Sequence, residues 1–211
     1  MAREDGWAVY KRSYEAQPPV VCWEQASPQW VAEVNAPLPP EPGQPERVDD
    51  EYERGGTAQV FMVFEPLAGQ RRVAVRARRT AVDFAHVVRR LVEVDSAQAD
   101  RVIGLMDNLN THGPGSVDEA LEPAAARRML GRWAIHHTPQ PASWLHRAET
   151  ELSGLGRQCL ERRMAEQETW AKEVSTGEKE RHERSLKGDG QFTTADARIK
   201  LKRLYPTIEM R

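Results

Sequence analysis

The sequence has 211 residues, of which 39% are hydrophobic and 29% are charged, so it can form one domain with a sizeable core. Its 30 basic and 32 acidic residues leave a net charge of -2, which excludes a protein that binds nucleic acid by bulk charge alone. No apolar run approaches the ~20 residues of a membrane span, and the N-terminus has no apolar signal core. Cys22 and Cys159 lie far apart in the sequence, as expected for a reducing compartment.

The first half of the chain predicts a strand, a proline-rich arm and a hairpin. The run Val20–Trp23 is apolar and ends on Glu24, a pattern typical of a buried strand. Five prolines lie within residues 35–45, and they indicate a loop or surface arm because proline lacks the backbone N–H. The β-rich runs at 59–66 and 71–77 are separated by a short turn, which favours an antiparallel hairpin.

The middle of the chain alternates helices with strands. A capping-box pattern at Thr80 begins a helix. The apolar run at 101–106 predicts a second buried strand, and this strand ends on Asp107. Ser116 is the expected cap of another helix that continues to about Gly131. A short strand is predicted over 134–138.

The last third predicts a long helix followed by charged chain. An apolar face predicts a helix from Trp144 to about Glu168. From Lys172 to Asp189 charge dominates, which indicates an exposed helix end or a flexible linker, and residues 192–206 predict a short basic helix. The order β-β-β-α-β-α-β-α predicts an α/β fold with a mixed sheet like that of ribonuclease H. This sheet is a three-strand meander followed by alternating strands and helices, and helices flank it.

Two of the predicted strands end on an acid, Glu24 and Asp107. Ligand crevices in open α/β sheets lie beyond the carboxyl ends of strands, so these acids indicate a site. A third acid near the start of the long helix is Glu149 or Glu151. Each lies roughly 80° from the apolar stripe on opposite flanks, so periodicity does not choose between them. Three carboxylates together suit Mg²⁺ or Mn²⁺, whereas the alternative is that each acid only begins a solvated loop.

Five stretches of the sequence resemble one known family. The first two, MDNLNTH (106–112) and SWLHRAE (143–149), follow the second buried strand and begin the long helix. Together with 51–69, 78–92 and 192–206, they resemble the catalytic domain of bacterial insertion-sequence transposases of the mariner superfamily. The resemblance covers nearly the whole chain. It implies a ribonuclease-H-like fold, a DDE/DDD triad, Mg²⁺ with Mn²⁺ as a substitute, and cut-and-paste cleavage and transfer of DNA strands.

Position by position, the resemblance implies that Glu24, Asp107 and Glu149 are the catalytic residues and the metal ligands. The family has an Asp-Glu pair where this sequence has Glu24-Gln25, and the extra methylene changes metal geometry. His146 also replaces an asparagine of the family's pattern. These departures leave the alternative of an inactive transposase remnant that only binds DNA or a partner. A ribonuclease-H-like nuclease without strand transfer is a third interpretation, which the transposase-like motifs disfavour.

Two groups of basic residues are predicted to contact DNA phosphates, with a solvated surface as the alternative. They are Arg71, Arg72, Arg78 and Arg79 around the hairpin, and Lys200, Lys202 and Arg203 in the last helix. A further set is expected near the acids because it lies in the family-like motifs. This set is Asn108, His112, Trp144 and His146.

We expect four segments: a lead-in remnant (1–14), a catalytic domain (15–170), a charged linker (171–191) and a basic C-terminal helix and tail (192–211). Full members of the family carry N-terminal helix-turn-helix DNA-binding domains, whereas this sequence begins shortly before its first strand. The expected protein is therefore the catalytic half alone. Its expected partners are DNA, as element ends and target, and either a second copy or a full-length transposase. The expected location is the bacterial cytoplasm near the nucleoid, without membrane contact.

Overall fold

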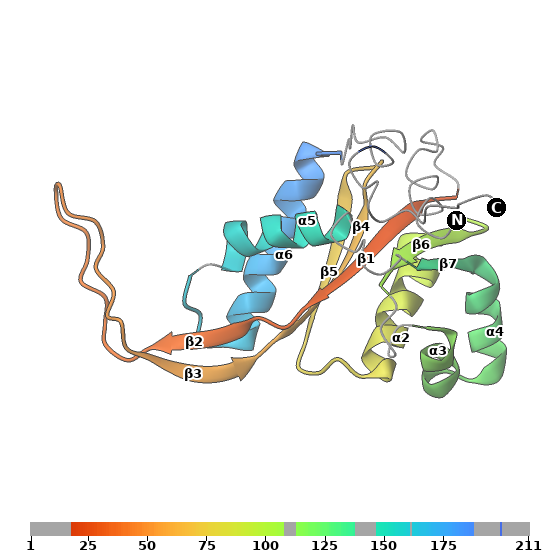
Figure 1. Cartoon of the computed structure of the whole chain (residues 1–211), viewed down its shortest axis with the longest axis horizontal. Helices are drawn as coiled ribbons and strands as arrows, with labels where there is room; N and C mark the ends of the chain where they lie inside the picture. Colours follow the sequence, from red (N-terminus) through yellow and green to blue (C-terminus); the bar gives the residue numbers. More distant parts are fainter. Residues whose placement is uncertain (1–17, 108–112, 138–146, 161, 188–198, 200–211) are drawn as a thin grey trace, which may run out of the picture.

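The centre of the molecule is a five-stranded mixed sheet. The structure is a computed structural model that describes residues 18–107, 113–137, 147–160, 162–187 and 199 (Figure 1). The strand order is β5-β4-β1-β6-β7, with β1 antiparallel to β4, β4 antiparallel to β5, and parallel pairing of β1 with β6 and of β6 with β7. The bounds are β1 Val20–Ala26, β4 Gln59–Glu65, β5 Gln70–Arg76, β6 Val102–Met106 and β7 Trp133–His137. The predicted meander and the two strands predicted after it are confirmed, and the structure shows that these two strands pair in parallel.

Helices cover both faces of this sheet. On one face, α2, α3 and α4 share an apolar core with β1, β4 and β6. On the other face, α5 and α6 pack against β4 and β5. Their bounds are α2 Ala81–Arg90, α3 Pro114–Ala120, α4 Pro123–Arg132, α5 Arg147–Leu155 and α6 Gln167–Arg184. The short π-helical turns η1 (Leu91–Asp95) and η3 (Gly156–Leu160) continue α2 and α5. None of the helices in the described part of the chain is long and apolar enough to cross a membrane.

Aromatic side chains form the centre of the larger core. Trp23 on β1 is 1% exposed. Its ring lies edge-on to Phe84 on α2 with a centroid distance of 4.9 Å, and edge-on to Phe61 on β4 at 6.1 Å. The capping box predicted at Thr80 is present, with the Asp83 backbone N–H donating to the Thr80 hydroxyl. The sequence therefore fixes the start of α2 locally, and burial of Phe84 joins this helix to the sheet.

The chain between β1 and β4 forms a second, two-stranded sheet that the sequence analysis did not predict. It consists of β2 (Gln29–Glu33) and β3 (Tyr52–Thr57), which pair antiparallel. The proline-rich segment connects the two strands, and Figure 1 shows it projecting away from the central sheet, as expected of a surface arm. β3 contains Gly55 and Gly56 against the Trp30 indole, and a side chain at either glycine would collide with this ring. Because of these glycines and the charged residues beside them, the sequence of β3 lacks the apolar pattern typical of a strand.

Two helices replace the single helix expected between Ser116 and Gly131. Pro123 begins α4, because proline fits the first turn of a helix and cannot continue the preceding one. The expected cap at Ser116 is wrong, since Gly113 precedes α3 and Ser116 is buried within it.

The long helix expected from Trp144 to Glu168 is also divided. In the described residues, α5 continues through η3 to Leu160, and α6 begins at Gln167. Residues 171–184, which the sequence analysis assigned to a charged linker or exposed helix end, belong to α6 and pack against β5. Trp170, Val174 and Gly177 form the narrow buried stripe of α6, and the many charges on its other faces obscured this stripe.

Candidate active site

The register of two parallel strands sets Glu24 beside Asp107. The paired residues end with Cys22 on β1 and Leu105 on β6, and the same register continued by two residues places Glu24 opposite Asp107. Side chains alternate between the faces of a strand. Both acids therefore lie on the face of Cys22 and Leu105, opposite to the face of Trp23, and both are partly exposed.

Glu149 belongs to the helix that packs on this same face. Ala148, its neighbour at the start of α5, is fully buried against Cys22 on β1 and Phe64 on β4. Glu24 is two residues beyond Cys22 on the same face of β1, which is about 7 Å along the strand. Glu149 itself is exposed. The three predicted acids are thus carried by β1, by the residue that follows β6 and by the helix that packs on the same face of the sheet.

The chemistry of these acids suits a hard divalent cation, because all their donor atoms are carboxylate oxygens. Among the described residues, however, no group of three His, Cys, Asp or Glu side chains is close enough to hold a metal ion. Glu24 accepts a hydrogen bond at Oε1 from the backbone N–H of Gln25 at 2.9 Å. The metal roles of Glu24, Asp107 and Glu149 therefore stay predictions. The set expected near the acids lies outside the described residues: Asn108, His112, Trp144 and His146.

Glu151, the second candidate for the third acid, has a different environment. Its carboxylate forms ion pairs with Arg71 on β5 and Arg181 on α6. Both guanidinium groups occupy the oxygens that a metal ion would need. The structure therefore gives different environments to the two candidates that helix periodicity left open. Glu151 is paired with two arginines in the interior, whereas Glu149 is exposed.

The prediction that Arg71 contacts DNA is wrong. Its side chain is 1% exposed, and Nη2 donates to the Gly177 carbonyl oxygen at 2.7 Å. Arg72 is also engaged within the protein, through an ion pair with Asp95 at 3.4 Å. Arg78 and Arg79 follow β5 in an exposed segment, so their DNA contacts stay predictions. The other predicted DNA contacts, Lys200, Lys202 and Arg203, lie outside the described residues.

The strand pairing also brings His137 next to Asp107. Met106 at the end of β6 is paired with His137 at the end of β7. The His137 Nδ1 atom lies 3.3 Å from the backbone carbonyl oxygen of Asp107. The sequence analysis did not select this residue, because only the register of β6 and β7 relates two positions that are 30 residues apart.

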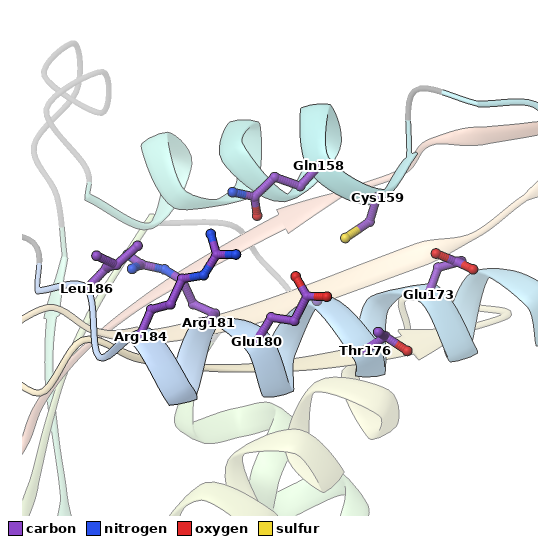
Figure 2. Close-up of a pocket in the computed structure, with 9 residues that line it drawn as sticks. Gln158, Cys159, Glu173, Thr176, Glu180, Arg181, Arg184 and Leu186 are labelled. Carbon is purple, nitrogen blue, oxygen red and sulfur yellow. The ribbon is translucent and has the colours of Figure 1, made fainter.

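A groove of about 250 Å³ lies between η3 and α6 (Figure 2), and none of the three acids lines it. Burial raises the pKa of the Cys159 thiol, with nearby Arg71 opposing this shift, so the thiol stays neutral and packs as an apolar group. Acidic and basic side chains both line the groove, which gives it no single charge preference. The lining residues with charge are Glu173, Glu180, Arg181 and Arg184.

The sheet order, with acids at neighbouring parallel strands and helices on both faces, defines a ribonuclease-H-like α/β protein. Residues 19–170 match the family model of the DDE superfamily endonucleases. The chain belongs to this family, which confirms the resemblance to transposase catalytic domains at the level of the family. A comparison with curated proteins found no match.

Solved structures of a mariner transposase have a similar fold. The Mos1 strand transfer complex is 16% identical with a TM-score of 0.52, over 88% of this chain and 58% of that chain. The Mos1 paired-end complex with the left transposon end is 16% identical with a TM-score of 0.51, over 90% and 60%. The Mos1 paired-end complex with Mn is 16% identical with a TM-score of 0.50, over 88% and 59%. The chain thus spans less than two thirds of the length of these relatives, and at this identity the likeness concerns the fold.

Proposed function

We propose that this chain is the catalytic unit of a DDE transposase, which cleaves and transfers DNA strands with Mg²⁺ or Mn²⁺. The observation that carries the proposal is the register that sets Glu24 beside Asp107 on the face packed against α5, where Glu149 follows the buried Ala148. Membership of the DDE superfamily endonucleases supports this function. The similar Mos1 structures are complexes with a transposon end and with Mn, which supports DNA as the substrate and a divalent metal as the cofactor.

In this proposal, Glu24, Asp107 and Glu149 hold the metal. When bound by these carboxylates, a divalent ion would supply activation of a hydroxyl nucleophile and stabilisation of the leaving oxygen of a phosphodiester. The protein's own contribution is to hold three mutually repelling carboxylates on rigid elements, because such sites need positions accurate to about 0.5 Å. The nucleophile is water for cleavage and a DNA 3′-hydroxyl for strand transfer, without a covalent protein–DNA intermediate.

We expect Arg78 and Arg79 to contact the DNA backbone. Both are exposed in the segment between β5 and α2. The double variant Arg78→Gln/Arg79→Gln should bind duplex DNA more weakly. The slope of log affinity against log salt concentration should be shallower by about 2, because each lost phosphate contact reduces this slope by about 0.9. Fluorescence anisotropy over a salt series measures this slope. The matched control is Arg127→Gln/Arg128→Gln, an exposed arginine pair on α4. Equal slopes for both double variants would contradict the assignment.

The second candidate function is that of an inactive transposase remnant. Two points favour it: the resemblance implies an aspartate where this chain has Glu24, and the described residues include no group of three metal ligands. Such a protein would bind DNA or a partner without cutting DNA. Metal binding distinguishes the two candidates, because only the catalytic unit needs the three acids to share an ion.

Calorimetric titration with Mn²⁺ tests the proposal on the wild-type chain and on Glu24→Asp. We expect both forms to bind, and Glu24→Asp to raise the Mn²⁺-dependent nicking of supercoiled DNA by about 10-fold, a change of the size that adjustments around metal ligands produce. The shorter aspartate restores the carboxylate position typical of the family. Equal nicking by the two forms would refute a geometric defect at position 24. No Mn²⁺ binding by either folded form would refute the proposal and favour the remnant.

A further inference from the structure

Three charged side chains form a buried cluster between β5, α5 and α6. We call Arg71, Glu151 and Arg181 the Arg–Glu–Arg cluster. Arg71 donates from Nη1 to Glu151 Oε1 at 3.1 Å, while Arg181 donates from Nε to Oε1 at 2.6 Å and from Nη2 to Oε2 at 2.9 Å. The Glu151 and Arg181 side chains are 14% and 11% exposed. Arginines from β5 and α6 therefore bind both oxygens of the Glu151 carboxylate on α5.

Each member of the cluster is costly to remove, because the remaining charges would stay buried without their partner. Two guanidinium groups share one carboxylate, and neither Arg71 Nε nor Arg181 Nη1 has a hydrogen-bond partner among the described residues. Loss of one partner from a buried ion pair leaves an uncompensated charge in a region of low dielectric constant. The Arg181 guanidinium also lies over the Phe64 ring, 5.8 Å from its centroid. The cluster therefore couples the position of α5 closely to that of α6.

The cluster and Ala148 together restrain rotation of α5 about its axis. Glu151 follows Glu149 by two residues, which is about 200° around a helix. Because Glu151 turns toward Arg71 on β5 and Arg181 on α6, Glu149 points away from these two elements. One residue earlier, Ala148 fixes the helix against Cys22 on β1. A helix held at these two places has one orientation for Glu149.

We propose that the Arg–Glu–Arg cluster is a positioning device for the active site. By binding Glu151, Arg71 and Arg181 set the rotation of α5 and so hold Glu149 toward the region of Glu24 and Asp107. This inference rests on the proposed metal-binding role of the three acids. Arg71 and Arg181 do not touch the reacting atoms, so they are positioning residues. Arg181 lies beyond residues 19–170, which match the family model, so in this proposal α6 contributes to the active site through its contact with Glu151.

Substitution of Arg181 in the full chain tests this role with two measurements. The variants are Arg181→Gln and Arg181→Lys, and the matched control is Arg184→Gln, which removes the same charge from an exposed position on α6. We expect Arg181→Gln to speed backbone hydrogen exchange in α5 and to weaken Mn²⁺ binding by about 10-fold, as loss of a group that orients metal ligands does. Arg181→Lys keeps the charge without the bidentate geometry and should show a smaller effect in both measurements. Arg184→Gln should match the wild type.

Two results would overturn the proposal. The first is unchanged α5 exchange in Arg181→Gln. The second is faster α5 exchange with wild-type Mn²⁺ affinity, measured at a temperature where circular dichroism shows each variant folded. If Arg181→Gln does not fold, the same two criteria apply to Arg181→Lys. Failure of the wild type to bind Mn²⁺ would instead refute the proposed function and the metal-site role of the cluster, while the exchange data would separately decide whether the cluster restrains α5.

Discussion

Asp107→Ala is expected to lower the affinity of the protein for Mn²⁺ by about 100-fold or more, because loss of even an outer-shell partner of a metal ligand costs about 10- to 100-fold. Asp107 directly follows β6, and the register of the parallel pairing with β1, continued by two residues, places it opposite Glu24. Its removal leaves two of the three carboxylates that we assign to the ion. We expect DNA nicking with Mn²⁺ to fall below detection at the same time.

The matched control is Asp100→Ala. Asp100 is an exposed aspartate shortly before the other end of β6, so its loss changes the net charge equally without touching the proposed site. Calorimetry with Mn²⁺ and a supercoiled-plasmid nicking assay would be run on both variants and on the wild type. Equal Mn²⁺ affinities for Asp107→Ala and Asp100→Ala would show that the measured ion binds elsewhere, and the assigned triad would then be wrong.

Trp23→Ala should lower the free energy of unfolding by about 3–5 kcal/mol, the range found for replacing a buried aromatic residue with alanine. Trp23 is 1% exposed and contacts Phe61 on β4 and Phe84 on α2 edge-on. The substitution leaves a cavity between the sheet and α2 and removes both aromatic contacts. Because a domain of this kind is stable by only about 5–15 kcal/mol, a large share of its stability depends on this side chain.

Urea unfolding followed by far-UV circular dichroism measures this loss. Tyr52→Ala is the control, since Tyr52 is an aromatic residue on β3 that is 46% exposed and contacts the Arg163 guanidinium. Its removal should cost less than about 1 kcal/mol, the size of an exposed cation–π contact. Similar unfolding midpoints for Trp23→Ala and the wild type would show that the aromatic core does not hold α2 on the sheet.

Local patterns in the sequence predicted most of the central sheet. The apolar run before Glu24, the hairpin at 59–77 and the run before Asp107 each depend on neighbouring residues, and all three form strands in the structure. The capping box at Thr80 has the same local character and is present at the start of α2. The arm strands β2 and β3 were not predicted, because the glycines of β3 fit against Trp30, which is distant in the sequence.

The roles of charged residues could not be predicted from their own neighbourhoods. Arg71 and Arg78 are similar members of one basic run, yet Arg71 is buried because Glu151, 80 residues away, and Gly177, 106 residues away, bind its guanidinium group. The charges of α6 likewise hid a helix whose buried stripe is set by contact with β5. Such partners come together only on folding, so a single charged residue shows no sign of them.

By itself, the sequence determined the positions of the five central strands, the start of α2 and the two acids at the ends of β1 and β6, because hydrophobic periodicity and capping act between near neighbours. The tertiary structure alone decided that Glu24 lies beside Asp107, since this depends on the pairing register of two strands that are far apart in the chain. It also distinguished Glu149 from Glu151 through the guanidinium groups of Arg71 and Arg181. Contacts between distant segments, formed when the sheet and its helices pack, supplied that information.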